Sequence, residues 1–194
     1  MNEYQSDALQ MRRDRQEADR RRRRRLVRAL LSNTLFLLAL VGIGLLRVFV
    51  LRPVEVQQAS MLPTLTEGDR LLVNTLGAHD RLPPRGVVIV LQKPQSDVLV
   101  VKRVIAVGGD TLRLTPAGVW LNGKLLSEPY IKPLDYTPLS LTVPPGQVFV
   151  LGDNRPKSED SRDFGTVPMA SILGTAFYRF WPWSRRGKLA GPQS

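Results

Sequence analysis

An uncharged stretch near the N-terminus constrains the fold of this chain more than any other feature. Residues 29–46 read ALLSNTLFLLALVGIGLL and include no charged side chain. As a helix they would rise roughly 27 Å, close to the roughly 30 Å hydrocarbon core of a bilayer. The flanking Arg28 and Arg47 can extend their guanidinium groups to the two interfaces. Because apolar residues resume after Arg47, we predict a transmembrane anchor over residues 29–51.

Two other interpretations of this stretch are a buried core helix and a cleaved signal peptide. The run is long for the apolar region of a signal peptide, and Gln57 interrupts the small-x-small pattern that cleavage before Ser60 would need. An uncleaved anchor is therefore the interpretation that we favour.

The first 28 residues are strongly basic, with ten arginines against five acidic residues. The six consecutive arginines at residues 20–25 repel one another, so they are solvated or bound to an anion. We predict a disordered tail over residues 1–28. A tail without a partner and one that binds anionic lipid both remain open, and nucleic acid is the partner we expect least.

Positive charge before an anchor keeps the N-terminus in the cytoplasm, so we expect residues 52–194 on the outer face of the cytoplasmic membrane.

Composition excludes several classes of chemistry. The chain has no cysteine and a single histidine, His79. Disulfides, thiolate zinc sites, iron–sulfur clusters and a cysteine nucleophile are excluded, as is a histidine-rich metal centre. His79 lies in a loop-like segment and receives no role. We therefore expect no metal, no cofactor and no imidazole base.

After residue 51 the chain has the pattern of a mostly β domain. Proline and glycine recur between short apolar runs, and helical periodicity is nearly absent. The dipeptide Asn122–Gly123 predicts a tight hairpin, and residues 108–110 and 144–146 predict further turns. Strands are expected at residues 70–74, 86–91, 98–107, 119–121 and 147–151.

The C-terminal part is rich in aromatic residues, with five of the thirteen between residues 177 and 183. Phe177 and Tyr178 are expected to close the core as part of a last strand. Trp181 and Trp183 are expected instead to rest at the level of lipid headgroups, a position that suits tryptophan.

Lys102 is the residue that ordinary structural roles explain least well. It lies between VLVV and, past Arg103, VIAV, a pattern typical of a strand buried on both faces. Alternation places Lys102 and Arg103 on opposite faces, so at least one of them has apolar surroundings. Burial lowers the pKa of a lysine, and a neutral lysine can act as a general base, whereas an arginine stays charged. A nearby serine would then complete a Ser–Lys catalytic pair.

Four segments follow one another after the predicted anchor: SMLPTL from Ser60, GDR from Gly68, KRVIAVGGD from Lys102 and GDNRPKSEDSRDFG from Gly152. In this order they resemble the sequence boxes of bacterial type I signal peptidases. The resemblance implies a compact antiparallel β domain behind one transmembrane helix, and a serine endopeptidase that forms an acyl-enzyme. By position, it implies that Ser60 is the nucleophile and Lys102 the general base.

The same resemblance implies roles for further residues. Ser158 would orient the Lys102 amine, and Gln58 takes the position of a side-chain donor to the oxyanion. The polar residues implied to support the site are Asp153, Asp160 and Arg162. The apolar residues implied to line the substrate pockets are Val54, Val56, Leu65, Val100 and Val101.

The implied substrates are exported preproteins that carry small residues, A-x-A, before the cleaved bond. Membrane lipid and the secretion translocon are the other expected partners. Ser60 follows Leu51 by nine residues, at most about 30 Å of extended chain, so the nucleophile is expected near the outer membrane face.

Two functions from other classes stay open at this point. The first is a membrane-tethered binding module for anionic lipid or RNA, in which Lys102 would be dispensable. The second is a self-cleaving regulator with a Ser–Lys pair. Such repressor-type proteases carry a DNA-binding helix-turn-helix where this chain has a predicted anchor.

Overall fold

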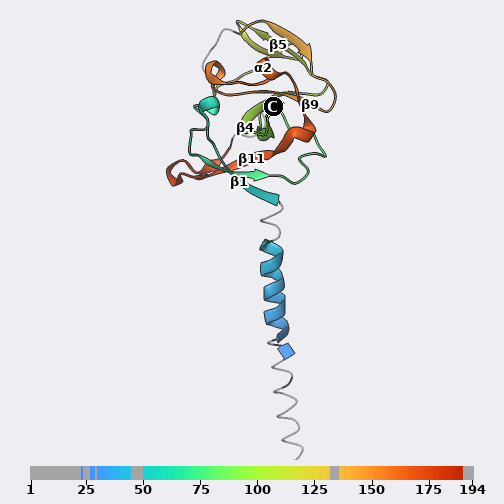
Figure 1. Cartoon of the computed structure of the whole chain (residues 1–194), viewed down its shortest axis with the longest axis vertical. Coiled ribbons are helices and arrows are strands. Elements are labelled where there is room, and N and C mark those ends of the chain that lie inside the picture. The colour runs from blue at the N-terminus through green and yellow to red at the C-terminus, as the bar shows by residue number, and fades with distance from the viewer. Residues whose placement is uncertain (1–22, 24–26, 29, 45–49, 132–135, 190–194) are drawn as a thin grey trace, which may run out of the picture. The chain divides into compact units, whose positions relative to one another are not determined.

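Figure 1 shows the computed structural model of the chain, which describes residues 23, 27–28, 30–44, 50–131 and 136–189. The chain divides into two compact units, residues 1–47 and residues 48–194. Each unit is described by itself.

The first unit is helical at residues 27–28 and 30–44, and every described residue of this stretch is exposed. Within the described part of the chain, no helix is both long and apolar enough to cross a membrane. Most of the basic tail lies outside the described residues, as do residues 29 and 45–49 of the predicted anchor.

The second unit is built on an antiparallel sheet of eight strands. Their order is β1-β2-β11-β3-β4-β9-β10, with β12 paired to β11. The strands are β1 Leu51–Glu55, β2 Arg70–Asn74, β3 Val88–Gln92, β4 Leu99–Val107, β9 Gln147–Leu151, β10 Val167–Pro168, β11 Ile172–Trp181 and β12 Gly187–Lys188. The long strands β4 and β11 both pair with β3, so they lie on either side of it near the middle of the sheet.

A smaller antiparallel sheet of four strands has the order β7-β6-β5-β8. Its strands are β5 Thr111–Thr115, β6 Gly118–Leu121, β7 Lys124–Leu125 and β8 Leu139–Thr142. Figure 1 shows β5 at the end of the domain opposite β1, with the helix α2 between them. Five short helical elements join the strands: η1 Ala59–Met61, η2 Arg155–Lys157, α2 Ser161–Phe164, η3 Met169–Ser171 and η4 Trp183–Arg185.

The strands expected from the sequence are present as β2, β3, β4, β6 and β9, with ends that differ by at most two residues. The hairpin between β6 and β7 is also confirmed, because Asn122 and Gly123 have φ angles of 51° and 79°. Left-handed φ at both central residues is the requirement of a type I′ turn, and asparagine and glycine tolerate it best. The antiparallel, mostly β fold class is therefore confirmed.

One expectation about the core is wrong. Phe177 lies in β11 as predicted, but its side chain is 41% exposed, whereas the preceding Ala176 is 3% exposed. Successive side chains of a strand point to opposite faces, and the small Ala176 occupies the inner one. Tyr178 is half-buried.

The core consists of three apolar clusters, and β4 contributes to all of them. The third cluster fills the space between the two sheets, with residues such as Ile105 and Phe149 facing Leu112. β4 is buried continuously from Val100 to Ala106, on both faces. Any charged side chain in this stretch is therefore removed from water.

Candidate active site

Lys102 occupies the middle of β4, opposite Ile89 of β3, and is only 1% exposed. Burial lowers the pKa of its amine from 10.5 to about 8, against the opposing effect of the negative charges on Asp160 and Glu159. With that pKa about a tenth of the molecules carry a neutral amine at pH 7. A neutral amine has a lone pair that can accept a proton.

Ser158 is the direct hydrogen-bond partner of this amine, with 3.1 Å between Lys102 Nζ and Ser158 Oγ. The Ser158 carbonyl accepts a hydrogen bond from Arg162 Nη2 at 3.1 Å, so the segment that carries Ser158 is fixed on its other side. The Lys102 side chain has four rotatable bonds, and this contact restricts where its amine points.

Ser60 lies in η1, which packs against β4 and against η2. It is 6% exposed and lines a groove. No hydrogen bond joins its hydroxyl to Lys102 among the described residues. Catalytic hydrogen bonds are often long in the absence of substrate and tighten once it binds.

Gly152 brings the Ser60 and Ser158 segments together. A Cβ atom at this position would lie 2.2 Å from Ser158 Oγ and 2.5 Å from the Ser60 carbonyl oxygen, so no other residue fits. Two residues on, Asn154 donates from its backbone N–H to the Ser60 carbonyl and from its side chain to the Ala59 carbonyl, both at 2.9 Å. The structure thus gathers Ser60, Lys102 and Ser158 from three separate segments.

Asp153 forms a buried ion pair behind this site. Its two carboxylate oxygens accept hydrogen bonds from Arg103 at 2.8 and 2.6 Å, and both side chains are at most 1% exposed. Thr64 donates to the same carboxylate at 2.5 Å, and Arg103 also donates to the Gly86 carbonyl at 2.6 Å. Both Lys102 and Arg103 are therefore buried, whereas the sequence required apolar surroundings for only one of them.

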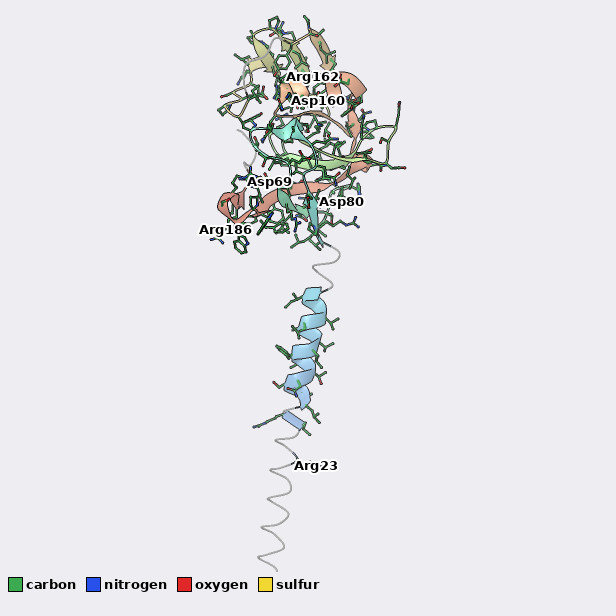
Figure 2. All side chains as sticks on the ribbon, turned by 60° about the vertical axis from the view of Figure 1, so that its left-hand side comes forward. Arg23, Asp69, Asp80, Asp160, Arg162 and Arg186 are labelled. Atoms are coloured by element: carbon green, nitrogen blue, oxygen red, sulfur yellow. The ribbon has the colours of Figure 1, made fainter. Side chains whose placement is uncertain are left out.

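Asp160 and Arg162 lie side by side at the start of α2 (Figure 2), joined by hydrogen bonds of 2.8 and 2.9 Å. Asp160 is the N-cap of this helix, and its carboxylate also accepts the backbone N–H of Gly152 at 3.0 Å. These two residues therefore hold both ends of the loop between Gly152 and Ser158.

The groove beside Ser60 has a volume of about 420 Å³ and runs between residues 53–61 and the start of β4. The predicted pocket residues that line it are Val54, Val56, Val100 and Val101, and Gln58 lines it as well. Leu65 is not among the lining residues; it is completely buried in the cluster that includes Val56 and Val101.

For several residues that contact the site, nothing in the sequence indicated which partners they would bind. Asn154 and Arg155 lie inside the GDNR segment, and their contacts could not be read from it. Glu128 and Tyr130, which bind Arg155 and Arg103 as described below, lie far from both in the sequence.

Ser158→Ala is expected to lower kcat by about 10- to 100-fold, because the Lys102 amine loses the contact that aims it. KM should change little, since Ser158 does not line the groove. The measurement is a steady-state analysis of peptide cleavage, with the exposed Ser140→Ala in β8 as the matched control. A Ser158→Ala variant with the kcat of this control would contradict the orienting role.

Comparisons with known proteins agree with the sequence boxes. The family model described as signal peptidase, peptidase S26, matches residues 27–181. A probable signal peptidase I-1 of Synechocystis is 42% identical over 164 residues, which cover 80% of this chain and 84% of that protein. The signal peptidase I of Leptolyngbya laminosa is 39% identical over 170 residues, 83% of each chain.

The signal peptidase I of Bacillus caldolyticus is 37% identical over 162 residues, 76% of this chain and 88% of that protein. A crystal structure of a signal peptidase I from Enterococcus faecalis aligns with a TM-score of 0.45 and 36% identity, over 49% of this chain and 97% of that chain. The match of the family model and the identities of the sequence relatives show that this chain belongs to the peptidase S26 family of signal peptidases.

Proposed function

We propose that this chain is a membrane-anchored serine endopeptidase that removes signal peptides from exported preproteins, with Ser60 as nucleophile and Lys102 as general base. The observation that carries the mechanism is the buried Lys102 amine, with a pKa of about 8 and a hydrogen bond to Ser158, in a strand that packs against the helix of Ser60. The family relationship supports the serine endopeptidase activity.

The reaction uses Lys102 as the proton carrier throughout. Its neutral amine takes the proton of the Ser60 hydroxyl while the oxygen attacks the carbonyl carbon of the cleaved bond. The resulting ammonium then gives this proton to the departing amine, and an ester with Ser60 remains. Lys102 next removes a proton from water, which attacks the ester; the signal peptide leaves as a carboxylic acid and Ser60 regains its proton.

The oxyanion of each tetrahedral intermediate needs hydrogen-bond donors. The Ser60 backbone N–H and the Gln58 side-chain amide are the groups we assign to it. Gln58 is exposed, lines the groove and precedes η1 without capping it through its side chain, so its amide is available. One such donor is worth roughly 3–4 kcal/mol of transition-state stabilisation.

The groove supports a preference for small residues. Five valines contribute to its wall, and Val56, Val100 and Val101 are each at most 9% exposed, so this part of the wall is apolar and firmly packed. A pocket of this kind accepts alanine and excludes charged side chains, because burial of an unpaired charge is costly.

The cleavage specificity is tested with the full chain in detergent and a preprotein whose signal ends in A-x-A. We expect one cut, directly after the second alanine, identified by mass spectrometry of the product. A matched preprotein with aspartate in place of that alanine should stay intact. No cut, or equal cutting of both preproteins, would contradict the proposal.

We infer membrane attachment at two places. Residues 29–46 are uncharged and lie between Arg28 and Arg47, and large apolar side chains of the helical stretch, such as Leu35, are exposed. In the second unit, Trp181 at the end of β11 and Trp183 at the start of η4 are 45% and 65% exposed, and such tryptophans would rest among lipid headgroups.

The guanidinium of Arg186 lies 5.1 Å from the ring centre of Trp183, so this aromatic surface also carries positive charge. Positive charge next to aromatic rings suits anionic lipid. Figure 2 places Arg186 and Asp69 at the same end of the domain, away from Asp160. Lipid is thus a proposed partner, and the secretion translocon, which delivers the preproteins, is another.

The membrane orientation follows from the basic tail and can be tested because the chain has no cysteine. In intact spheroplasts, a membrane-impermeant maleimide should label Ser140→Cys in β8 but spare Ser6→Cys in the tail. Permeabilised cells should show labelling of both. The reverse pattern in intact spheroplasts would mean that the domain lies in the cytoplasm.

A further inference from the structure

A buried polar cluster connects the smaller sheet to the active-site loop. Glu128, three residues after β7, accepts hydrogen bonds from Arg155 Nη1 at 3.1 Å and Nη2 at 2.5 Å. The side chains of Arg155 and Glu128 are 1% and 5% exposed. Tyr136 also contacts Arg155 through its hydroxyl. The contact is firmly held, because the loss of either partner of a buried ion pair leaves the other charge buried and uncompensated.

Tyr130 adds a second connection from the same segment. Its hydroxyl donates to Glu128 at 2.9 Å, and its ring lies 4.1 Å from the guanidinium carbon of Arg103. Burial raises the pKa of Tyr130, so the phenol keeps its proton and remains a donor. Glu128 and Tyr130 together therefore hold both buried arginines, Arg155 directly and Arg103 through the aromatic ring.

The two arginines in turn fix residues 152–155. Arg155 Nε donates to the Gly152 carbonyl at 3.0 Å, and Arg103 binds both oxygens of Asp153. Asn154, between them, holds the backbone carbonyls of η1. A Cβ atom on Gly152 would clash with both the Ser158 side chain and the Ser60 carbonyl, so a shift of this residue toward them must displace one of the two segments.

We propose that Glu128 and Tyr130 are positioning residues for the catalytic pair: through Arg155 and Arg103 they hold residues 152–155, which fix the Ser60 backbone and adjoin Ser158, the hydrogen-bond partner of the Lys102 amine. This inference rests on the proposed Ser60–Lys102 mechanism. Neither residue lines the groove, which is formed by residues 53–61 and the start of β4. Their loss should therefore lower kcat and leave KM nearly unchanged.

The test compares variants of the full chain in detergent, with kcat and KM measured at a temperature where every variant is folded. Glu128→Gln keeps the shape of the side chain but removes its charge, and we expect kcat about tenfold lower. The neighbouring exposed Ser127→Ala is the matched control and should keep the wild-type kcat. KM should stay within about twofold for both variants.

A paired replacement separates positioning from stability. Replacement of both partners of a buried ion pair by apolar residues often restores stability. Glu128→Leu combined with Arg155→Met should therefore regain most of the thermal stability lost in Glu128→Leu alone. Its kcat should nevertheless remain about 100-fold reduced, because methionine offers no N–H to the Gly152 carbonyl.

Two results would overturn the inference: a Glu128→Gln variant with the kcat of Ser127→Ala, or a double variant that regains stability and kcat together. Failure of the underlying mechanism looks different. It would appear as cleavage by Ser60→Ala, or as no cleavage by the unmodified chain, whatever the Glu128 variants do.

Discussion

Lys102→Arg is expected to abolish precursor cleavage in a chain that still folds. Arginine keeps the positive charge and the approximate length of lysine, but its guanidinium does not deprotonate, so it cannot accept the Ser60 proton. Lys102→Met and Ser60→Ala should be equally inactive, the first without a base and the second without a nucleophile. Each variant should fall to the residual level that binding and oxyanion contacts alone supply. Cleavage is measured on an A-x-A precursor, with the amount of cut product followed over hours.

The matched control for this series is Lys124→Arg, at an exposed position of β7, which should cleave at the wild-type rate. A thermal melt of each variant verifies folding before activity is compared. Substantial cleavage by folded Lys102→Arg would rule out Lys102 as the general base.

The second large effect is expected at the buried ion pair of Arg103 and Asp153. Arg103→Met leaves the carboxylate of Asp153 buried without its bidentate partner, and a loss of about 3–5 kcal/mol of unfolding free energy is the usual consequence. Cleavage should fall at the same time, because Asp153 is part of the segment that holds the Ser60 backbone. Urea unfolding of the full chain in detergent measures the stability.

An exposed ion pair of the same domain provides the control. Arg70 binds Glu55 at 3.2 Å, with side chains 54% and 52% exposed. Pairs that water can reach contribute about 0–1 kcal/mol, so Arg70→Met should cost no more than about 1 kcal/mol. Equal losses for Arg103→Met and Arg70→Met would show that the buried pair does not organise the domain.

The sequence was most informative where local chemistry leaves few choices. An apolar run on both sides of Lys102 predicted the doubly buried strand β4, and Asn122–Gly123 predicted the turn after β6. Membership of the signal peptidase family was predicted from four boxes and is confirmed. The roles of Ser60, Lys102 and Ser158 remain predictions that the geometry supports.

Other features depend on contacts between distant segments and have no local signal. β7 consists of two exposed residues and β8 has no buried residue, so neither contains the apolar run from which the other strands were predicted; β5 alternates exposed and buried residues but is only five residues long. Glu128 and Arg155 are 27 positions apart, and neither neighbourhood indicates a partner. Phe177 was misplaced because an apolar side chain was assumed to face inward, whereas the alternation of β11 sends it outward.

The most direct test of Lys102 as the base uses the absence of cysteine from the chain. In Lys102→Cys the thiol is unique, and aminoethylation attaches an amine of nearly lysine length, with a lower pKa because sulfur withdraws electrons. The wild-type kcat/KM should fall below a midpoint near pH 8, since only the neutral amine of Lys102 is active.

The unmodified Lys102→Cys variant should be inactive. Aminoethylation should restore cleavage, and the pH below which kcat/KM falls should be lower than in the wild type. EDTA should affect neither profile, because the mechanism uses no metal. If the midpoint of the fall in kcat/KM stays near pH 8 in the aminoethylated variant, or if the unmodified variant is active, the assignment of Lys102 as the general base is contradicted.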